Sequence, residues 1–249
     1  MVVQGEEVLA AESYTYLGIE LDEKLSRKRM GKARKKKGLG VLAMLEKSLR
    51  RTAIPLEYRA LVVRGIAMPA MKYGAEAYGS TAMITGEIQK VANIALKIIS
   101  GNGCSLTAVR RDLNIPPIQA TAAGAQSRAL TKFPTLRTEV ARILNCGRTN
   151  TRCWLGKTRG ETKKRRSRDE AWRLLEDKEK SKAWKRYKEK NFEKTSKLFR
   201  NLTALESTLQ KGWKAVLQIR TGHLWTCERA ARRGVADENL LTVCPCCEK

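Results

Sequence analysis

The spacing of apolar residues along the chain changes from strand-like to helix-like after residue 22. Within residues 1–22, Val2-Val3 and Val8-Leu9 flank a turn at Gly5. Strand-forming residues then return in the run from Tyr14 to Ile19. Such a pattern of β-branched and aromatic residues around a glycine turn predicts a β-hairpin. Further along, apolar residues recur three or four positions apart, as they do on the buried face of a helix.

Four of the later stretches are predicted helices, with bounds 24–50, Pro55 to Pro69, Ile88 to Gly101, and Pro116-Pro117 onward. The last three also carry start or stop signals for a helix, proline at the first turn or glycine after the last. The fold class predicted is therefore mainly α, with a short N-terminal β-hairpin, a thumb-like helical bundle and a basic helical C-terminal region.

A shift in composition near Cys146 divides this helical part. Residues 146–168 are polar, basic and rich in glycine, which predicts a linker. Residues 169–200 resemble one charged helix with few apolar side chains, and an amphipathic stripe returns from Leu205 to Val216. We therefore expect four parts, with separate packing units on the two sides of the linker. These are a hairpin over 1–22, a helical domain over 23–145, the basic linker over 146–168 and a basic helical region over 169–249.

Charge narrows the range of partners. The 249 residues include 50 Lys and Arg against 25 Asp and Glu, a formal net charge of +25. Such an excess favours a polyanionic partner, and nucleic acid, RNA or DNA, is the leading choice. An anionic membrane is the second choice, but the sequence has no clear basic amphipathic helix, no lipidation signal and no apolar run of membrane-spanning length. No membrane partner is therefore expected.

Cysteine usage and the N-terminus bear on location. Seven cysteines, an odd number, show no disulfide-framework spacing, and the first residues do not resemble a signal peptide. An intracellular, reducing compartment is expected. The basic run at 163–168 also has the pattern of a nuclear localisation signal, which favours the nucleus.

Two basic runs are the candidate phosphate contacts. If the first is helical, its side chains should point in every direction, and they can still bind phosphates because Coulomb attraction needs no single geometry. The alternative is a solvated helix that binds nothing. The candidate residues are Arg27, Lys28, Arg29, Lys32, Arg34, Lys35, Lys36 and Lys37 in the first run, and Lys163, Lys164, Arg165, Arg166 and Arg168 in the second.

Aromatic residues interleave with charge just after the second run. Trp172, Trp184 and Tyr187 are surrounded by lysine and arginine. In one interpretation these rings stack on unpaired bases while the cations hold the backbone. In the other they dock a helix on the rest of the protein. The sequence leaves both open.

Candidate catalytic chemistry is sparse. His223 is the only histidine, and no two of the five aspartates lie close in sequence, so we predict no catalytic residue. Cys244 and Cys247 have the Cys-x-x-C spacing of half a zinc site, which His223 and Cys227 could complete. The alternative is a thiol-rich tail without metal. Apart from this zinc ion, no cofactor is expected.

Several short motifs, in order along nearly the whole chain, resemble the region that follows the catalytic palm in reverse transcriptases of non-LTR (LINE-type) retrotransposons. An aromatic-Leu-Gly strand is followed by Leu-Asp and Leu-Ser, then by a helix with a proline and Tyr-Gly-Ala-Glu, and finally by Arg-Thr-Gly-His and Cys-Pro-x-Cys. The matching segments are Tyr14 to Asp22, Leu21 to Ser26, Ile54 to Leu56, Ala67 to Glu76, Ile88 to Val91, Ile219 to His223 and Cys244 to Cys247.

This resemblance implies a function. The chain would be the thumb and C-terminal part of an RNA-directed DNA polymerase, binding RNA or an RNA–DNA template-primer, with fingers, palm and catalytic aspartates upstream. Tyr16, Leu17 and Gly18 would lie at the palm–thumb junction near the primer end. His223 would belong to the Thr-Gly-His element rather than to a zinc site, and the zinc knuckle would be truncated.

No polymerase activity of its own is expected for the chain on this interpretation. Two other classes stay open: a domesticated, architectural nucleic-acid binder, and a small zinc-dependent interaction module.

Overall fold

A computed structural model describes much of the chain. The described residues are 2–3, 6–7, 12–22, 26–137, 141–142, 154–164, 167–206, 209–222, 231, 234 and 237–238. Within them the fold is mainly α-helical and begins with short antiparallel strands, which confirms the predicted fold class. No helix in these ranges is long and apolar enough to cross a membrane.

The N-terminal strands form two separate antiparallel pairs. β1 (Val2–Val3) pairs with β2 (Glu6–Glu7), and β3 (Ser13–Tyr16) pairs with β4 (Ile19–Asp22). Val8 and Leu9, expected in the first hairpin, lie outside the described residues. Leu17, expected in a strand, instead forms the turn between β3 and β4 together with Gly18.

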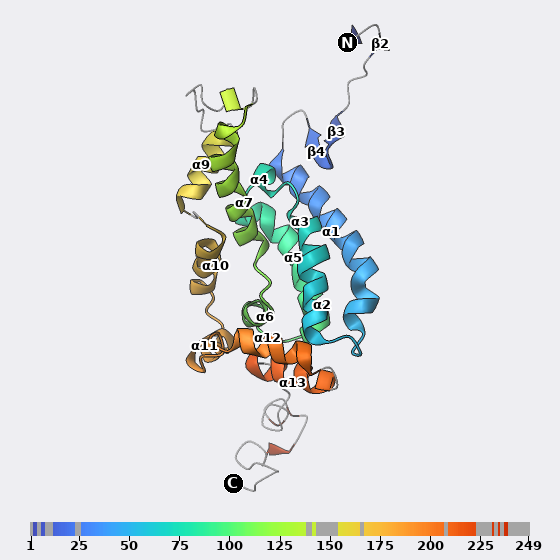
Figure 1. The fold of residues 1–249 in the computed structure, drawn as a ribbon, viewed down its shortest axis with the longest axis vertical. Helices are drawn as coiled ribbons and strands as arrows, with labels where there is room; N and C mark the ends of the chain where they lie inside the picture. The colour runs from blue at the N-terminus through green and yellow to red at the C-terminus, as the bar shows by residue number, and fades with distance from the viewer. Residues whose placement is uncertain are drawn as a thin grey trace.

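The helical bundle is elongated, and α1 lies along α5 for much of its length (Figure 1). Two glycines of α1 permit its close packing, one against α5 and the other against Met71, which lies further along the chain. A Cβ atom on Gly31 would lie 2.8 Å from Ile84, and one on Gly38 would lie 2.7 Å from Met71. The elements of this part are α1 (Arg27–Arg50), α2 (Leu56–Val62), η1 (Val63–Ala67), α3 (Met68–Lys72), α4 (Ala75–Tyr78), α5 (Ala82–Ser100), α6 (Leu106–Leu113), α7 (Ile118–Lys132) and η2 (Phe133–Thr135).

Pro69 does not end its helix, contrary to the prediction from sequence. The backbone continues from α2 through the π-helical turn η1 into α3, which ends at Lys72. Proline lacks an N–H and its ring collides with the preceding turn of a regular helix. Here Pro69 occupies the first turn of α3, directly after the wider π turn, where a missing donor is tolerated.

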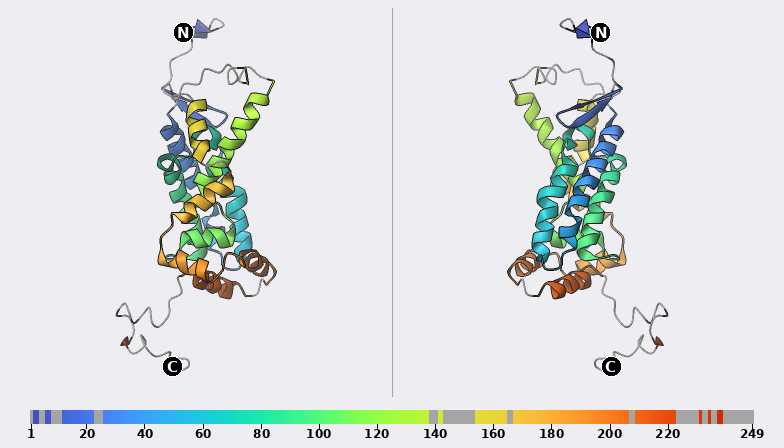
Figure 2. Two further views of the ribbon diagram at one scale, coloured as in Figure 1. Left: turned by 90° about the vertical axis from the view of Figure 1, so that its left-hand side faces the viewer. Right: turned by 90° about the vertical axis from the view of Figure 1, so that its right-hand side faces the viewer.

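The C-terminal helices complete the same core. The elements are α9 (Trp154–Lys164), α10 (Arg168–Asp177), α11 (Lys182–Glu189), α12 (Ser196–Leu205) and α13 (Gln210–Arg220). The predicted linker thus contains a helix, and the predicted single charged helix is three short ones. Phe199 and Leu217 lie in one hydrophobic cluster with Leu49 and Ile88, so the described parts do not pack as separate units. Figure 2 shows α12 and α13 across the end of the bundle opposite the β3–β4 hairpin.

Candidate nucleic-acid interface

The β3–β4 hairpin turns through two residues with left-handed backbone. Leu17 has φ 46° and Gly18 has φ 73°, and Tyr16 pairs with Ile19 across the turn. A two-residue turn with both φ values positive matches the twist of the strands, and asparagine followed by glycine suits it best. Leucine there is strained by roughly 1–2 kcal/mol. The Leu17 side chain gains little packing in return, because it is 70% exposed.

Two side chains from the helices hold this strained turn. The Tyr73 hydroxyl donates a hydrogen bond of 2.9 Å to the Leu17 carbonyl, and the Arg34 guanidinium donates one to the Gly18 carbonyl. Arg34 also lies over the Tyr73 ring, 4.8 Å from its centroid. Because α1 supplies Arg34 and the end of α3 supplies Tyr73, the turn is fixed against both helices.

A groove of about 610 Å³ lies between the turn and these helices, and we call it the hairpin groove. It is lined by Thr15, Leu17, Gly18 and Glu20 from the hairpin, by Ala33, Arg34 and Lys37 from α1, and by Pro69, Ala70 and Tyr73 from α3 and its end. The structure therefore brings two predicted primer-end residues, Leu17 and Gly18, together with two predicted phosphate contacts, Arg34 and Lys37. Tyr16 is not among the lining residues but is 57% exposed beside them.

Four of the eight predicted cations on α1 are engaged by contacts within the protein, three of them in ion pairs. Arg27 pairs with Glu161 at 2.8 Å, Arg29 with Glu20 at 2.7 Å, and Lys35 with Glu87 at 2.7 Å. Arg34 is buried in its contact with the hairpin turn. These four cations attach α1 to the hairpin, α5 and α9, so they are poorly placed to meet a phosphate as well.

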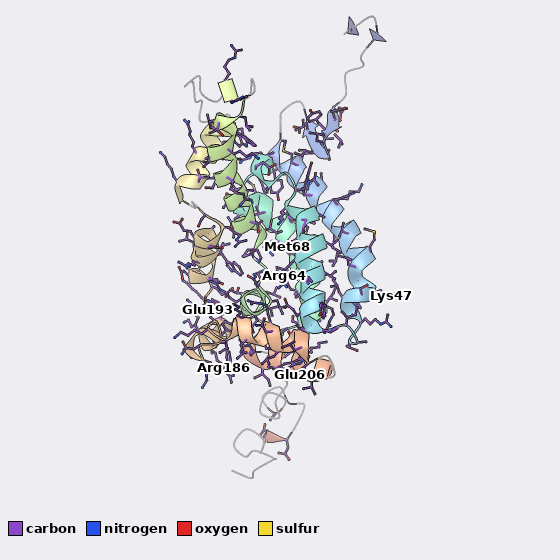
Figure 3. The ribbon with its side chains drawn as sticks, viewed as in Figure 1. Lys47, Arg64, Met68, Arg186, Glu193 and Glu206 are labelled. Carbon is purple, nitrogen blue, oxygen red and sulfur yellow. The ribbon has the colours of Figure 1, made fainter. Side chains whose placement is uncertain are left out.

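The other half of the run forms an exposed stripe. Lys28, Lys32, Lys36 and Lys37 are exposed, and the described residues offer none of them an ion pair. The first three are spaced four residues apart, so they share one face and rise about 6 Å per step, or about 12 Å in all. Each strand of a duplex carries one phosphate per ~3.4 Å of axis, so the stripe spans about three or four phosphates. Lys47 continues the outer side of α1 (Figure 3).

The second basic run lies partly outside the described residues. Arg165, Arg166 and the side chain of Lys164 are not described. Lys163 lies in the last turn of α9 and Arg168 begins α10, and both are exposed. Arg168 lies 3.0 Å from Asp169. Because Glu161 pairs with Arg27, the end of α9 lies beside the start of α1. Lys163 is therefore near the same end of the molecule as Lys28.

The aromatic residues of the C-terminal region are structural. Trp172, Trp184 and Tyr187 are 5%, 1% and 0% exposed, and the last two stack with ring centroids 5.3 Å apart. The Trp184 indole donates to the Glu176 carbonyl at 3.2 Å. Of the two interpretations left open by the sequence, docking of helices is the one that the structure supports.

A buried carboxylate that the sequence analysis passed over joins α6 to α13. Asp112 is fully buried, and Arg220 binds it with both Nε, at 2.8 Å, and a terminal nitrogen, at 2.7 Å. The Tyr187 hydroxyl donates to the same carboxylate at 2.7 Å, and burial followed by Asp112 raises the pKa of Tyr187. Arg220 is the first residue of the Arg-Thr-Gly-His element, and its partner in this structure is Asp112. An aspartate between the apolar residues Val109 and Leu113 was the available signal in the sequence.

The candidate zinc ligands are outside the described residues. Cys244, Cys247, His223 and Cys227 all fall there. Within the described ranges, no group of three or more His, Cys, Asp or Glu side chains is placed to hold a metal ion. Asp112, the most buried aspartate, already has its charge matched by Arg220.

Comparisons with known proteins supply no relative from which a function could be transferred. No protein-family model, no curated protein and no solved structure matches the chain.

Proposed function

We propose that this protein binds RNA or an RNA–DNA template-primer duplex along α1 and at the hairpin groove. One observation carries the proposal: the exposed lysine stripe of α1 runs beside the residues of α1 that line the groove. Lys32 and Lys36 of the stripe each directly precede a groove residue, Ala33 and Lys37, so stripe and groove lie on neighbouring faces of the helix, about 100° apart. A duplex lying along α1 would thus bring one strand to the hairpin turn.

The stripe and the groove differ in chemistry, and they would contact different parts of the nucleic acid. Lysine ammonium groups attract phosphates without reading sequence, and each contact releases condensed counterions. The groove adds exposed apolar and aromatic surface, with Leu17 at 70% and Tyr73 at 51% exposure, and Tyr16 beside it is 57% exposed. Such side chains pack on sugars and unpaired bases at a strand end. The resemblance to non-LTR reverse transcriptases, in which this turn lies near the primer end, supports the same placement.

The contribution proposed for the protein itself is binding rather than synthesis. A polymerase centre needs carboxylates that converge on two metal ions. No two of the five aspartates of this chain lie close in sequence. An architectural nucleic-acid binder would use the same lysines, and it would differ by binding a continuous duplex as tightly as a primer-template junction.

The test is the salt dependence of affinity for an RNA–DNA hybrid. Replacing Lys28, Lys32 and Lys36 together with Gln should lower the affinity and reduce the log–log salt slope by about 2–3 units, at roughly 0.9 per lost contact. A matched control replaces three exposed lysines at the other end of the molecule with Gln: Lys182, Lys185 and Lys190. Both variants lose three charges, so a purely global charge effect would change them equally.

Equal slopes for the two variants would contradict the proposed interface. A wild-type slope near zero would contradict phosphate binding altogether.

A further inference from the structure

The ring of Tyr73, at the end of α3, is both exposed and held in place. Its hydroxyl donates a hydrogen bond of 2.9 Å to the Leu17 carbonyl, and the Arg34 guanidinium lies over the ring, 4.8 Å from its centroid. Arg34 covers one face of the ring, yet Tyr73 is 51% exposed. Much of the exposed surface must therefore belong to the face turned away from Arg34. Because Tyr73 also lines the hairpin groove, a fixed aromatic surface is available to a molecule there.

An exposed ring that is already fixed is well prepared to bind another flat ring. Ordering a mobile side chain at an interface costs conformational entropy, and a ring held by two contacts avoids most of that cost. Aromatic side chains stack on the faces of nucleic-acid bases with little regard to which base it is. A base can stack on a protein ring only where no neighbouring base covers the same face, as at an unpaired position or a strand end. The surroundings of Tyr73 therefore favour an unpaired base.

Among the described residues, the hairpin groove offers a ligand one unpaired charge. Glu20 lines the groove but pairs with Arg29 at 2.7 Å, and Arg34 is buried with its guanidinium on the Gly18 carbonyl. Lys37 lines the groove, is exposed, and has no ion pair within the described part of the chain. It follows Arg34 by three residues on α1, so the Cβ atoms of the two residues are about 5–6 Å apart. A free ammonium group is thus close to the ring that Arg34 contacts, as the phosphate of a nucleotide is close to its base.

From this arrangement we propose that the hairpin groove holds one unpaired nucleotide of the bound strand, with its base on the Tyr73 ring and its phosphate on Lys37. The groove volume of about 610 Å³ is in the range of sites that hold one small organic molecule. Pro69 and Ala70 add apolar wall. The inference rests on the proposed function and adds a preference to it. A duplex that ends in an unpaired nucleotide should bind more tightly than a blunt duplex.

The experiment compares two RNA–DNA hybrids of the same duplex length, one blunt and one with a single unpaired nucleotide at a strand end, each strand end being tested in turn. Affinities for the full chain are measured by fluorescence anisotropy. The unpaired nucleotide carries 5-iodouracil, which on irradiation crosslinks to an aromatic side chain stacked on it. Mass spectrometry then identifies the crosslinked residue.

Three variants separate stacking from other roles of the tyrosine. Tyr73→Leu removes the ring, whereas Tyr73→Phe keeps the ring and removes the hydroxyl that holds the hairpin turn. Tyr58→Leu is the matched control, because Tyr58 is 50% exposed, lies on α2 and does not line the groove.

We expect the wild type to bind the hybrid with the unpaired nucleotide about fivefold more tightly than the blunt one, or better, since stacking on one aromatic side chain has an effect of this size. The crosslink should form at Tyr73. Tyr73→Leu should lose both the preference and the crosslink, Tyr58→Leu should keep both, and Tyr73→Phe should keep the preference within about twofold. Lys37→Gln should reduce the preference, whereas Lys36→Gln, in the neighbouring stripe, should lower both affinities alike.

The outcomes distinguish this inference from the proposed function. Equal affinities of the wild type for the two hybrids, with the salt slope of phosphate binding, would overturn the inference and leave the proposed function standing. A crosslink to another residue would overturn it as well. So would a Tyr73→Phe variant that loses as much as Tyr73→Leu, because the tyrosine would then act only through the turn. Failure to bind either hybrid would overturn both proposals.

A free mononucleotide has the same chemistry as a nucleotide held in a strand, and adenosine monophosphate tests that source. Its saturable binding to the wild type, lost in Tyr73→Leu and without any preference between the two hybrids, would assign the groove to a free nucleotide and overturn the assignment to a bound strand.

Discussion

The buried ion pair between Asp112 and Arg220 permits the sharpest stability prediction. Asp112 accepts hydrogen bonds from Arg220 at 2.7 and 2.8 Å, from Tyr187 at 2.7 Å and from Ser196 at 3.0 Å. Arg220→Met keeps much of the side-chain stem and removes the cation, which leaves a fully buried carboxylate without its counter-charge. Breaking one partner of such a pair typically costs about 3–5 kcal/mol. For a chain of this size that is roughly 6–20 °C in the midpoint of thermal unfolding.

Urea unfolding followed by far-UV circular dichroism measures this loss, and a double variant checks its cause. Replacing both partners, as Asp112→Leu with Arg220→Met, removes both charges. Tyr187 and Ser196 can then pair with each other, since their hydroxyl oxygens are 2.9 Å apart. The double variant should therefore be more stable than Arg220→Met alone. A loss below about 1 kcal/mol in Arg220→Met, or losses that simply add in the double variant, would refute this reasoning.

Three further outcomes follow from other contacts. Leu17→Asn should raise the free energy of unfolding in urea by about 0.5–1 kcal/mol, because asparagine tolerates the left-handed turn. The same change should weaken nucleic-acid binding, since it removes an exposed apolar side chain at the groove. A gain in both stability and nucleic-acid affinity would contradict our account. Burial opposes ionisation of Glu161, but the Ser80 N–H and then Arg27 outweigh it and lower its pKa below the ordinary 4.5. Its stabilisation is therefore present above about pH 4.5 and lost as the pH falls further, so wild type and Glu161→Gln should converge in stability between pH 6 and pH 3. The protein should extend no primer on an RNA template with Mg²⁺ and nucleotides; incorporation that survives a control for contaminating polymerase would disprove this.

The periodicity of apolar residues and the turn signals were enough to predict the mainly α fold, because both depend on residues within a single segment. The helix after Pro117 and the stop at Gly101 are found as predicted, with Gly101 at φ 92°. Pro69 was misjudged, since a single proline signal does not show whether the backbone will widen into a π turn before it. The basic composition of 146–168 likewise hid α9, whose Trp154 indole donates to the Glu76 carbonyl, 78 residues away.

The sequence was enough to predict which basic residues belong to the candidate interface, but not which of them are exposed. Arg34 and Lys36 are equivalent in a sequence, yet one is buried against the hairpin turn and the other is exposed. That difference depends on which face of α1 meets Tyr73, a tertiary contact between residues far apart in the chain. The same holds for Asp112, whose partner lies 108 residues further on.

The most direct test of the interface is a crosslink from the hairpin turn itself. A photoreactive benzoylphenylalanine in place of Leu17 would sit at the exposed turn of the hairpin groove. The same residue in place of Leu198, which is 58% exposed on α12 at the opposite end, provides the control. Each protein is irradiated with an end-labelled RNA–DNA primer-template at low salt.

Our account predicts a crosslink from position 17 to the nucleic acid, concentrated near the primer end, that is lost when Lys28, Lys32 and Lys36 are replaced by Gln. Position 198 should give no crosslink above background. Crosslinking from position 198 with none from position 17 would place the nucleic acid on the other end of the molecule and contradict the central claim.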